Sequence, residues 1–146
     1  MARLRVSVTI RRSPRAVWAY LEQVERHPEW MRDCVALRFE GRRRRGVGTR
    51  FVARTRVFGM TLDDPMTVVR WERRRAIGVE HGGPVRGAGE FRLRPRLLGG
   101  TRFQWREELT LPWWMGGPIG VLAAKPLLKW IWKGSLRNLQ ARLESR

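Results

Sequence analysis

The chain has 146 residues, 42% of them hydrophobic and 10% aromatic, which is the composition of a globular protein and excludes a disordered one. Its formal net charge is +18, from 31 basic and 13 acidic residues spread over nearly every segment. No zinc, helix-turn-helix or RNA-binding aromatic motif accompanies this charge, so it does not by itself favour nucleic acid as a partner.

The first residues and the cysteine content bear on where the protein works. Residues 1–10 alternate charged and apolar side chains and lack the continuous apolar run of a signal peptide. Cys34 is the single cysteine, so no intramolecular disulfide can form, and we expect it to be an inert core thiol. We therefore expect a cytoplasmic protein, and the length is most simply explained by one domain over residues 1–146.

A strand followed by two short helices is predicted for the first thirty residues. Apolar side chains occupy every second position from Leu4 to Ile10, which is the period of a half-buried strand. Ser13 and Pro14 are typical of an N-cap and a first helical residue, and apolar spacings of three and four continue the helix. A second helical turn is expected at residues 26–31, where Trp30 supplies an apolar anchor.

About six consecutive strands are predicted between residues 34 and 111, because short apolar-alternating runs are separated by turn signals. The arginines of residues 42–45 lie between glycines and indicate a solvated hairpin loop. The sequence Asp63-Asp64-Pro65 is expected to interrupt the fourth of all the strands with a bulge or kink. Adjacent strand residues face opposite ways, so these two carboxylates are not expected to converge on one substrate atom.

A long amphipathic helix is predicted after Pro126, where a kink is also an option, because apolar residues recur at helical spacing. The uncharged run of residues 109–124 contains prolines and glycines and is shorter than the roughly 20 residues of a membrane-spanning helix. The element order therefore predicts an α+β fold. In it, a curved antiparallel sheet of about six to seven strands wraps around a long C-terminal helix, with two short helices after the first strand.

These elements, with the sequences SPRAVWAYL, HPEW, GVGTRF, GEFRLRP, GGTRF and LRNLQARLE, resemble the START-like helix-grip superfamily, particularly its polyketide cyclase/dehydrase and lipid-transport (SRPBCC) branch. The resemblance spans nearly the whole chain. It implies a helix-grip fold and a single START-like ligand-binding domain, with a deep apolar cavity between sheet and helix for lipids, polyketides, sterols or quinones. It does not imply one chemistry, because such proteins include enzymes, carriers and ligand sensors.

Three functions remain open at this point. The first is binding or transport of a hydrophobic small molecule, and the second is a polyketide aromatase/cyclase activity. The third is a basic peripheral membrane or nucleic-acid-associated protein. Residues on the predicted inward faces are the candidate ligand contacts, although each can equally be plain core. They are Phe51, Val69, Trp71, Phe91, Phe103, Trp105, Leu109, Trp113, Leu128 and Trp132.

Three residues are candidates for acid or base chemistry: Glu107, His81 and Tyr20. Glu107 shares a strand face with Trp105 and Leu109, so its carboxylate must be paired, protonated or in a wet pocket. Either Glu107 contacts the ligand or acts as an acid/base group with a raised pKa, or it has a structural role. In the structural alternative it pairs with a nearby arginine or is released from the apolar face by a bulge.

His81 either projects into the cavity as a base or ligand-orienting group, or is a solvated residue at a strand end. His27 is expected to be structural, in a surface turn. No spacing of histidine, cysteine and carboxylate residues indicates a metal site, and no cofactor is expected.

Trp130 is predicted to project on the side of the C-terminal helix opposite to Trp132. All three lysines of the chain, Lys125, Lys129 and Lys133, lie close to it in the sequence. A transient contact with an anionic membrane, a homodimer contact and a partly covered surface aromatic are the alternatives.

Overall fold

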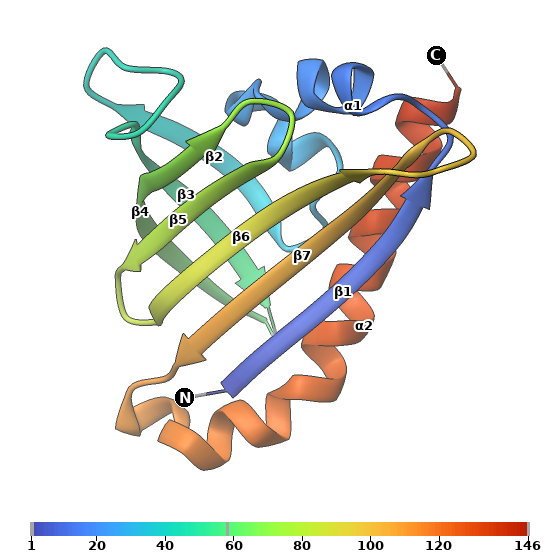
Figure 1. Cartoon of the computed structure of the whole chain (residues 1–146). Helices are drawn as coiled ribbons and strands as arrows, with labels where there is room; N and C mark the ends of the chain where they lie inside the picture. The colour runs from blue at the N-terminus through green and yellow to red at the C-terminus, as the bar shows by residue number, and fades with distance from the viewer. Residues whose placement is uncertain (1, 58, 146) are drawn as a thin grey trace.

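The computed structural model describes residues 2–57 and 59–145 (Figure 1). The chain begins with strand β1 (Ala2–Ile10), helix α1 (Pro14–Leu21) and a 3₁₀ helix, η1 (Val24–Glu29). Six strands follow, and then a 3₁₀ turn, η2 (Trp113–Met115), and the helix α2 (Gly117–Glu144). The six strands are β2 (Cys34–Glu40), β3 (Arg50–Val57), β4 (Met60–Glu72), β5 (Ala76–Gly82), β6 (Arg86–Pro95) and β7 (Thr101–Thr110).

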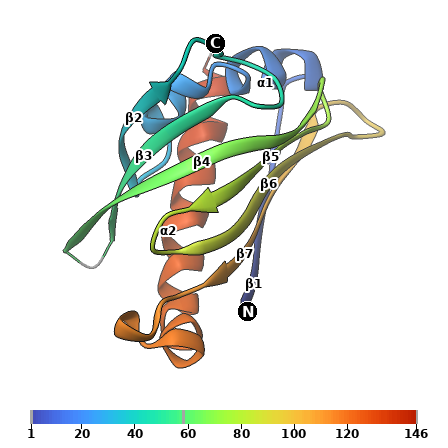
Figure 2. The same ribbon diagram turned by 90° about the vertical axis from the view of Figure 1, so that its left-hand side faces the viewer.

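All seven strands form one antiparallel sheet in the order β1-β7-β6-β5-β4-β3-β2. Every neighbour in this order except the β1–β7 pair is also a neighbour in sequence, so the sheet is a meander that the first strand joins at its β7 edge. The sheet curves around α2, as the two perpendicular views in Figures 1 and 2 show. The predicted α+β fold and helix-grip arrangement are confirmed.

Local sequence explains the start of α1. The Ser13 hydroxyl accepts a hydrogen bond from the backbone N–H of Ala16 at 3.2 Å, and Pro14 is the first helical residue. An N-cap of this kind stabilises a helix by about 1 kcal/mol. The cap fixes where the helix begins, and its face with Val17, Tyr20 and Leu21 is buried in the core.

The helix α2 covers the sheet with one apolar stripe. Trp132, Leu136, Leu139 and Leu143 are buried there, each at 4% exposure or less. Burial of each of these side chains stabilises the fold by roughly 1.5–3 kcal/mol. The helix is also tied to β1, because the Gln140 side chain donates a hydrogen bond to the Thr9 carbonyl at 2.7 Å. These contacts fix the distance between helix and sheet along the second half of α2.

Two sequence expectations about these elements are corrected or refined. Strand β4 is not interrupted at Pro65, which lies opposite Val52 of β3. On its other edge, β4 pairs with β5 only from Met66 onward, so Pro65 lies just outside that pairing. Proline is tolerated at such a position because no further strand pairs there. The irregularity in β4 lies instead between Val68 and Arg70. Pro126 lies inside the continuous helix α2, whose N-terminal part runs at an angle to the rest in Figure 1.

Among residues 2–57 and 59–145, no helix is both long enough and apolar enough to cross a membrane. This agrees with the sequence-based expectation for residues 109–124, which form the end of β7, the turn η2 and the start of α2.

Candidate functional site

A cavity of about 190 Å³ lies between the concave face of the sheet and α2. Its walls come from η1, from strands β2 to β7, from η2 and from the middle of α2, and most of the side chains that line it are apolar. Six of the ten predicted ligand contacts line it: Phe51, Phe91, Trp105, Leu109, Leu128 and Trp132.

The other four predicted contacts lie elsewhere. Phe103 is fully buried in the main core, and Trp71 packs edge-to-face against Trp18 with ring centroids 5.3 Å apart. Val69 is 45% exposed because Val68 takes the inward position at the β4 irregularity. Trp113 is 87% exposed, since β7 ends at Thr110 and the chain turns outward in η2. The inward placement expected for Val69 and Trp113 is therefore wrong.

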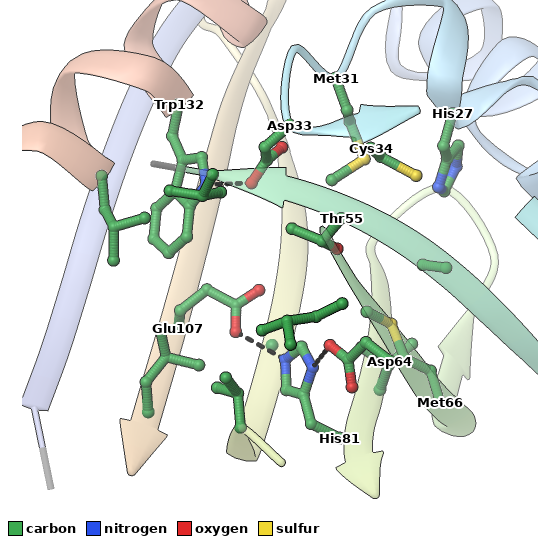
Figure 3. A pocket seen from close by; sticks show the side chains of 18 of the residues that line it. His27, Met31, Asp33, Cys34, Thr55, Asp64, Met66, His81, Glu107 and Trp132 are labelled. Atoms are coloured by element: carbon green, nitrogen blue, oxygen red, sulfur yellow. Dashed lines mark hydrogen bonds and ion pairs between the residues drawn. The ribbon is translucent and has the colours of Figure 1, made fainter. Parts of the chain in front are cut away.

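A buried cluster of three titratable side chains forms one end of the cavity, and Figure 3 shows His81 between the two acids. His81 Nδ1 lies 2.7 Å from Asp64 Oδ2, and His81 Nε2 lies 2.9 Å from Glu107 Oε2. The three residues come from adjacent or near strands, β4, β5 and β7. Their side chains are 7% (His81), 13% (Asp64) and 8% (Glu107) exposed.

The carboxylate of Glu107 is held from a second side as well. The indole Nε1 of Trp105 donates a hydrogen bond to Glu107 Oε1 at 3.0 Å. Gly89 of β6 lies opposite Glu107 in the sheet, and a Cβ atom there would collide with the carboxylate. A glycine at this position therefore leaves the space that the Glu107 side chain occupies.

This geometry sets the charge of His81. Burial of the ring disfavours the charged form and lowers its pKa, but the hydrogen bonds and the negative charges of Asp64 and Glu107 outweigh burial and raise the pKa of His81 to about 10. At neutral pH the ring is therefore an imidazolium that donates from both nitrogens. Because both ring nitrogens are protonated, it cannot act as a general base, and as an acid it releases its proton less readily than an ordinary imidazolium. Its two hydrogen bonds orient the carboxylates of Asp64 and Glu107.

A third buried acid, Asp33, lines the same cavity near α2. Its Oδ2 accepts a hydrogen bond from Trp132 Nε1 at 3.0 Å, as drawn in Figure 3. The Trp132 ring stacks on Trp105 with centroids 4.7 Å apart, so the two indoles make one aromatic wall. Burial raises the pKa of Asp33 above its usual range, and the bond from Trp132 only partly opposes this shift.

His27 and Cys34 also line the cavity. His27 is 6% exposed, not in a surface turn as expected, and its Nε2–H donates to the Leu21 carbonyl at 2.8 Å. Burial lowers the pKa of His27 to about 4, so the ring is neutral. Burial also raises the pKa of Cys34 to about 12, which keeps it a thiol and fits the prediction of an inert residue.

The three candidate catalytic residues thus separate into a pair and an outlier. His81 and Glu107 contact each other in the cavity wall, which is neither the solvated strand end considered for His81 nor the arginine pair or bulge considered for Glu107. Tyr20 lies in the main core outside the cavity lining, and its hydroxyl donates to Glu29 Oε1 at 3.0 Å.

Sequence reasoning missed Asp64 and Asp33. Asp64 alternates with Leu62, Met66 and Val68 on the inward face of β4, the same signal of an acid on an apolar face that singled out Glu107. Its neighbour Asp63 points outward to Arg54 at 3.0 Å, so the expected divergence of the two acids is correct. For Asp33, which lies in the connection before β2, no periodic pattern gives such a signal.

The residues expected to contact a membrane differ in exposure along α2. Trp130 is 59% exposed and the Arg32 guanidinium lies 5.2 Å from its ring centroid, while Lys133 is exposed and Lys125 and Lys129 are half-buried. Over the described part of the chain, no three His, Cys, Asp or Glu side chains are placed to hold a metal ion.

The amino-acid sequence matches the family model described as polyketide cyclase/dehydrase and lipid transport over residues 1–144. No curated protein sequence matches the chain.

Solved structures with similar folds cover almost the entire chain. A protein from Thermus thermophilus has a TM-score of 0.81 and 17% identity, with 99% of this chain and 98% of that chain covered. A START superfamily protein from Mycobacterium smegmatis has a TM-score of 0.69 and 17% identity, with 99% and 95% covered. The ZhuI aromatase/cyclase from Streptomyces sp. R1128 has a TM-score of 0.76 and 14% identity, with 99% and 94% covered. At such identities the likeness concerns the fold.

Proposed function

The chain belongs to the polyketide cyclase/dehydrase and lipid transport family, and from this premise we propose that it binds or transports a hydrophobic small molecule between the sheet and α2. The observation that supports the proposal best is the cavity itself. Apolar and aromatic side chains line it, and a few polar groups lie at defined places in its wall. This combination is typical of ligand sites, where apolar area supplies affinity and a few polar groups supply orientation.

The test uses a substitution that fills the cavity. Thr55 of β3 faces the cavity, whereas Thr61 of β4 is exposed. Protein purified from its native host is extracted with organic solvent and analysed by mass spectrometry, for the wild type, Thr55→Phe and Thr61→Phe. We expect a copurifying lipid or aromatic compound with wild type and Thr61→Phe, and its loss with Thr55→Phe.

Ligand that is retained in full by folded Thr55→Phe would contradict a site in this cavity. A wild type that carries no compound and shows no rise in melting temperature with any member of a lipid and aromatic library would contradict binding altogether.

The second candidate is an aromatase/cyclase activity on a polyketide chain, which the buried Asp64–His81–Glu107 cluster favours. Cyclisation with loss of water needs a group that removes a proton from carbon and another that protonates the departing hydroxyl. Carboxylate and imidazolium in direct contact supply both kinds of group. A cavity that folds the reactive chain would add most of the remaining rate enhancement.

This candidate is tested with a reactive poly-β-ketone substrate, by following the aromatic product with chromatography and mass spectrometry. Glu107→Gln and His81→Gln are expected to lower turnover by about 10²-fold or more, which is the usual contribution of acid–base groups. Turnover that survives both replacements would remove these residues from the mechanism.

A further inference from the structure

Charge is distributed very differently inside the cavity and on the surface. The chain carries 31 lysines and arginines, yet none of those that the structure describes lines the cavity. The titratable residues that do line it are Asp33, Asp64, Glu90, Glu107, His27, His81 and Cys34. A strongly basic protein therefore encloses a cavity whose charged groups are mostly acids.

Three of these residues contribute no net charge at neutral pH. Glu90 is compensated by ion pairs with Arg92 and, at 3.2 Å, with Arg70. His27 is neutral because its pKa is about 4, and Cys34 is a thiol because its pKa is about 12. The charge of the cavity wall is therefore set by His81 and the three buried aspartates and glutamates.

The charges of the Asp64–His81–Glu107 cluster do not sum to zero. One imidazolium lies between two carboxylates, so one negative charge of Asp64 and Glu107 has no cationic partner among the lining residues. Asp33 adds a further acid and no positive charge. A second anion buried beside this cluster would be strongly disfavoured, because repulsion between like charges is weakly screened away from water.

The aromatic side chains of the cavity wall also favour a cation over an anion. Trp105 and Trp132 stack at 4.7 Å, and Phe91 lies 5.4 Å from Trp105, all three in the cavity lining. The faces of aromatic rings carry partial negative charge, which attracts a cation and repels an anion.

We infer that the cavity takes an apolar molecule that carries a protonated amine, and that it rejects apolar carboxylates of the same size. The inference rests on the proposed binding function, because it names the class of ligand for the same cavity. The ammonium group lies against the Asp64–His81–Glu107 cluster, and the apolar body contacts the indole wall.

Three probes with one apolar body test this inference: 2-naphthylmethylamine, 2-naphthylmethanol and 2-naphthoate, measured by isothermal titration calorimetry at pH 7. We expect the amine to bind about tenfold more tightly than the alcohol and the carboxylate to bind most weakly. Glu107→Gln and Asp64→Asn each remove one negative charge with little change of shape, and both should bring the amine-to-alcohol affinity ratio close to one. Asp63→Asn, on the exposed face of β4 next to Asp64, should leave the amine-to-alcohol affinity ratio unchanged.

Each possible result either supports or overturns the inference. Tighter binding of the naphthoate than of the amine overturns the inference, and so does an amine preference that persists in folded Glu107→Gln and Asp64→Asn. Binding of the alcohol without any preference for the amine overturns the ligand class and leaves the proposed function standing. Failure of all three probes to bind the folded wild type overturns the inference, whereas the proposed function is overturned only by the copurification and library results described above. The wild-type series remains decisive if neither variant folds.

Discussion

His81 holds its proton more tightly than an ordinary histidine because it is the one cation between two buried carboxylates. Its pKa in the folded state is about 10, against an ordinary value of 6.5 that applies to the unfolded chain. The folded state therefore binds more protons between these values, so stability falls as pH rises through this range. The contribution of His81 is fully present below pH 6.5 and is lost as pH rises through about 10.

His81→Gln is therefore expected to destabilise the fold by roughly 3 kcal/mol at pH 6, because one partner of a buried ion cluster is removed. The difference from wild type should shrink toward pH 10, as measured by urea unfolding at pH 6, 8 and 10. His27→Asn is the matched control: the pKa of His27 is lowered to about 4, so this variant should keep the wild-type slope above pH 6.5. Equal slopes for wild type and His81→Gln would contradict the role given to His81.

The strands of this protein were predictable because each carries its own period-two pattern, and β7 is the clearest case. Phe103, Trp105, Glu107 and Leu109 alternate with exposed or half-buried residues, and the inward face of β7 is the predicted one. The partners of Glu107 were not predictable in this way. His81 is 26 residues away in sequence, and Asp64 is a further 17 from His81, so their contact depends on the register of four strands.

The packing of β6 against β7 gives a prediction at the level of elements. Gly89 leaves the space that the Glu107 carboxylate occupies, so Gly89→Ala is expected to displace this side chain and destabilise the fold by about 1–3 kcal/mol. Gly82→Ala in β5 is the control, since the nearest atom to its Cβ would be the Pro65 carbonyl oxygen at 3.6 Å. Urea unfolding of both variants measures the difference. Similar stability losses would show that the Gly89–Glu107 contact is not tight.

At the scale of the whole molecule, the surface combines a net charge of +18 with large apolar side chains near the N-terminal end of α2. Trp113, Trp114, Ile119 and Leu122 are between 52% and 87% exposed there. Leu111, Met115 and Ala124, from the same part of the chain, line the cavity. Exposed apolar surface next to a cavity is suited to contact with a membrane, and the net charge favours an anionic one.

Sedimentation with vesicles tests whether the surface that carries Lys125, Lys129, Lys133 and Trp130 contacts an anionic membrane. We expect the protein to bind vesicles that contain phosphatidylglycerol at low ionic strength, and this binding to weaken as salt is added, because salt screens exposed charges. Lys129→Ala with Lys133→Ala should reduce the binding by roughly 1 kcal/mol per lysine if both approach the lipid surface.

Arg94→Ala with Arg96→Ala is the matched control, since it removes two charges from the exposed β6–β7 hairpin. If both double variants lose the same affinity, only the net charge matters and α2 is not the contact surface; if salt has no effect, the attraction is not electrostatic.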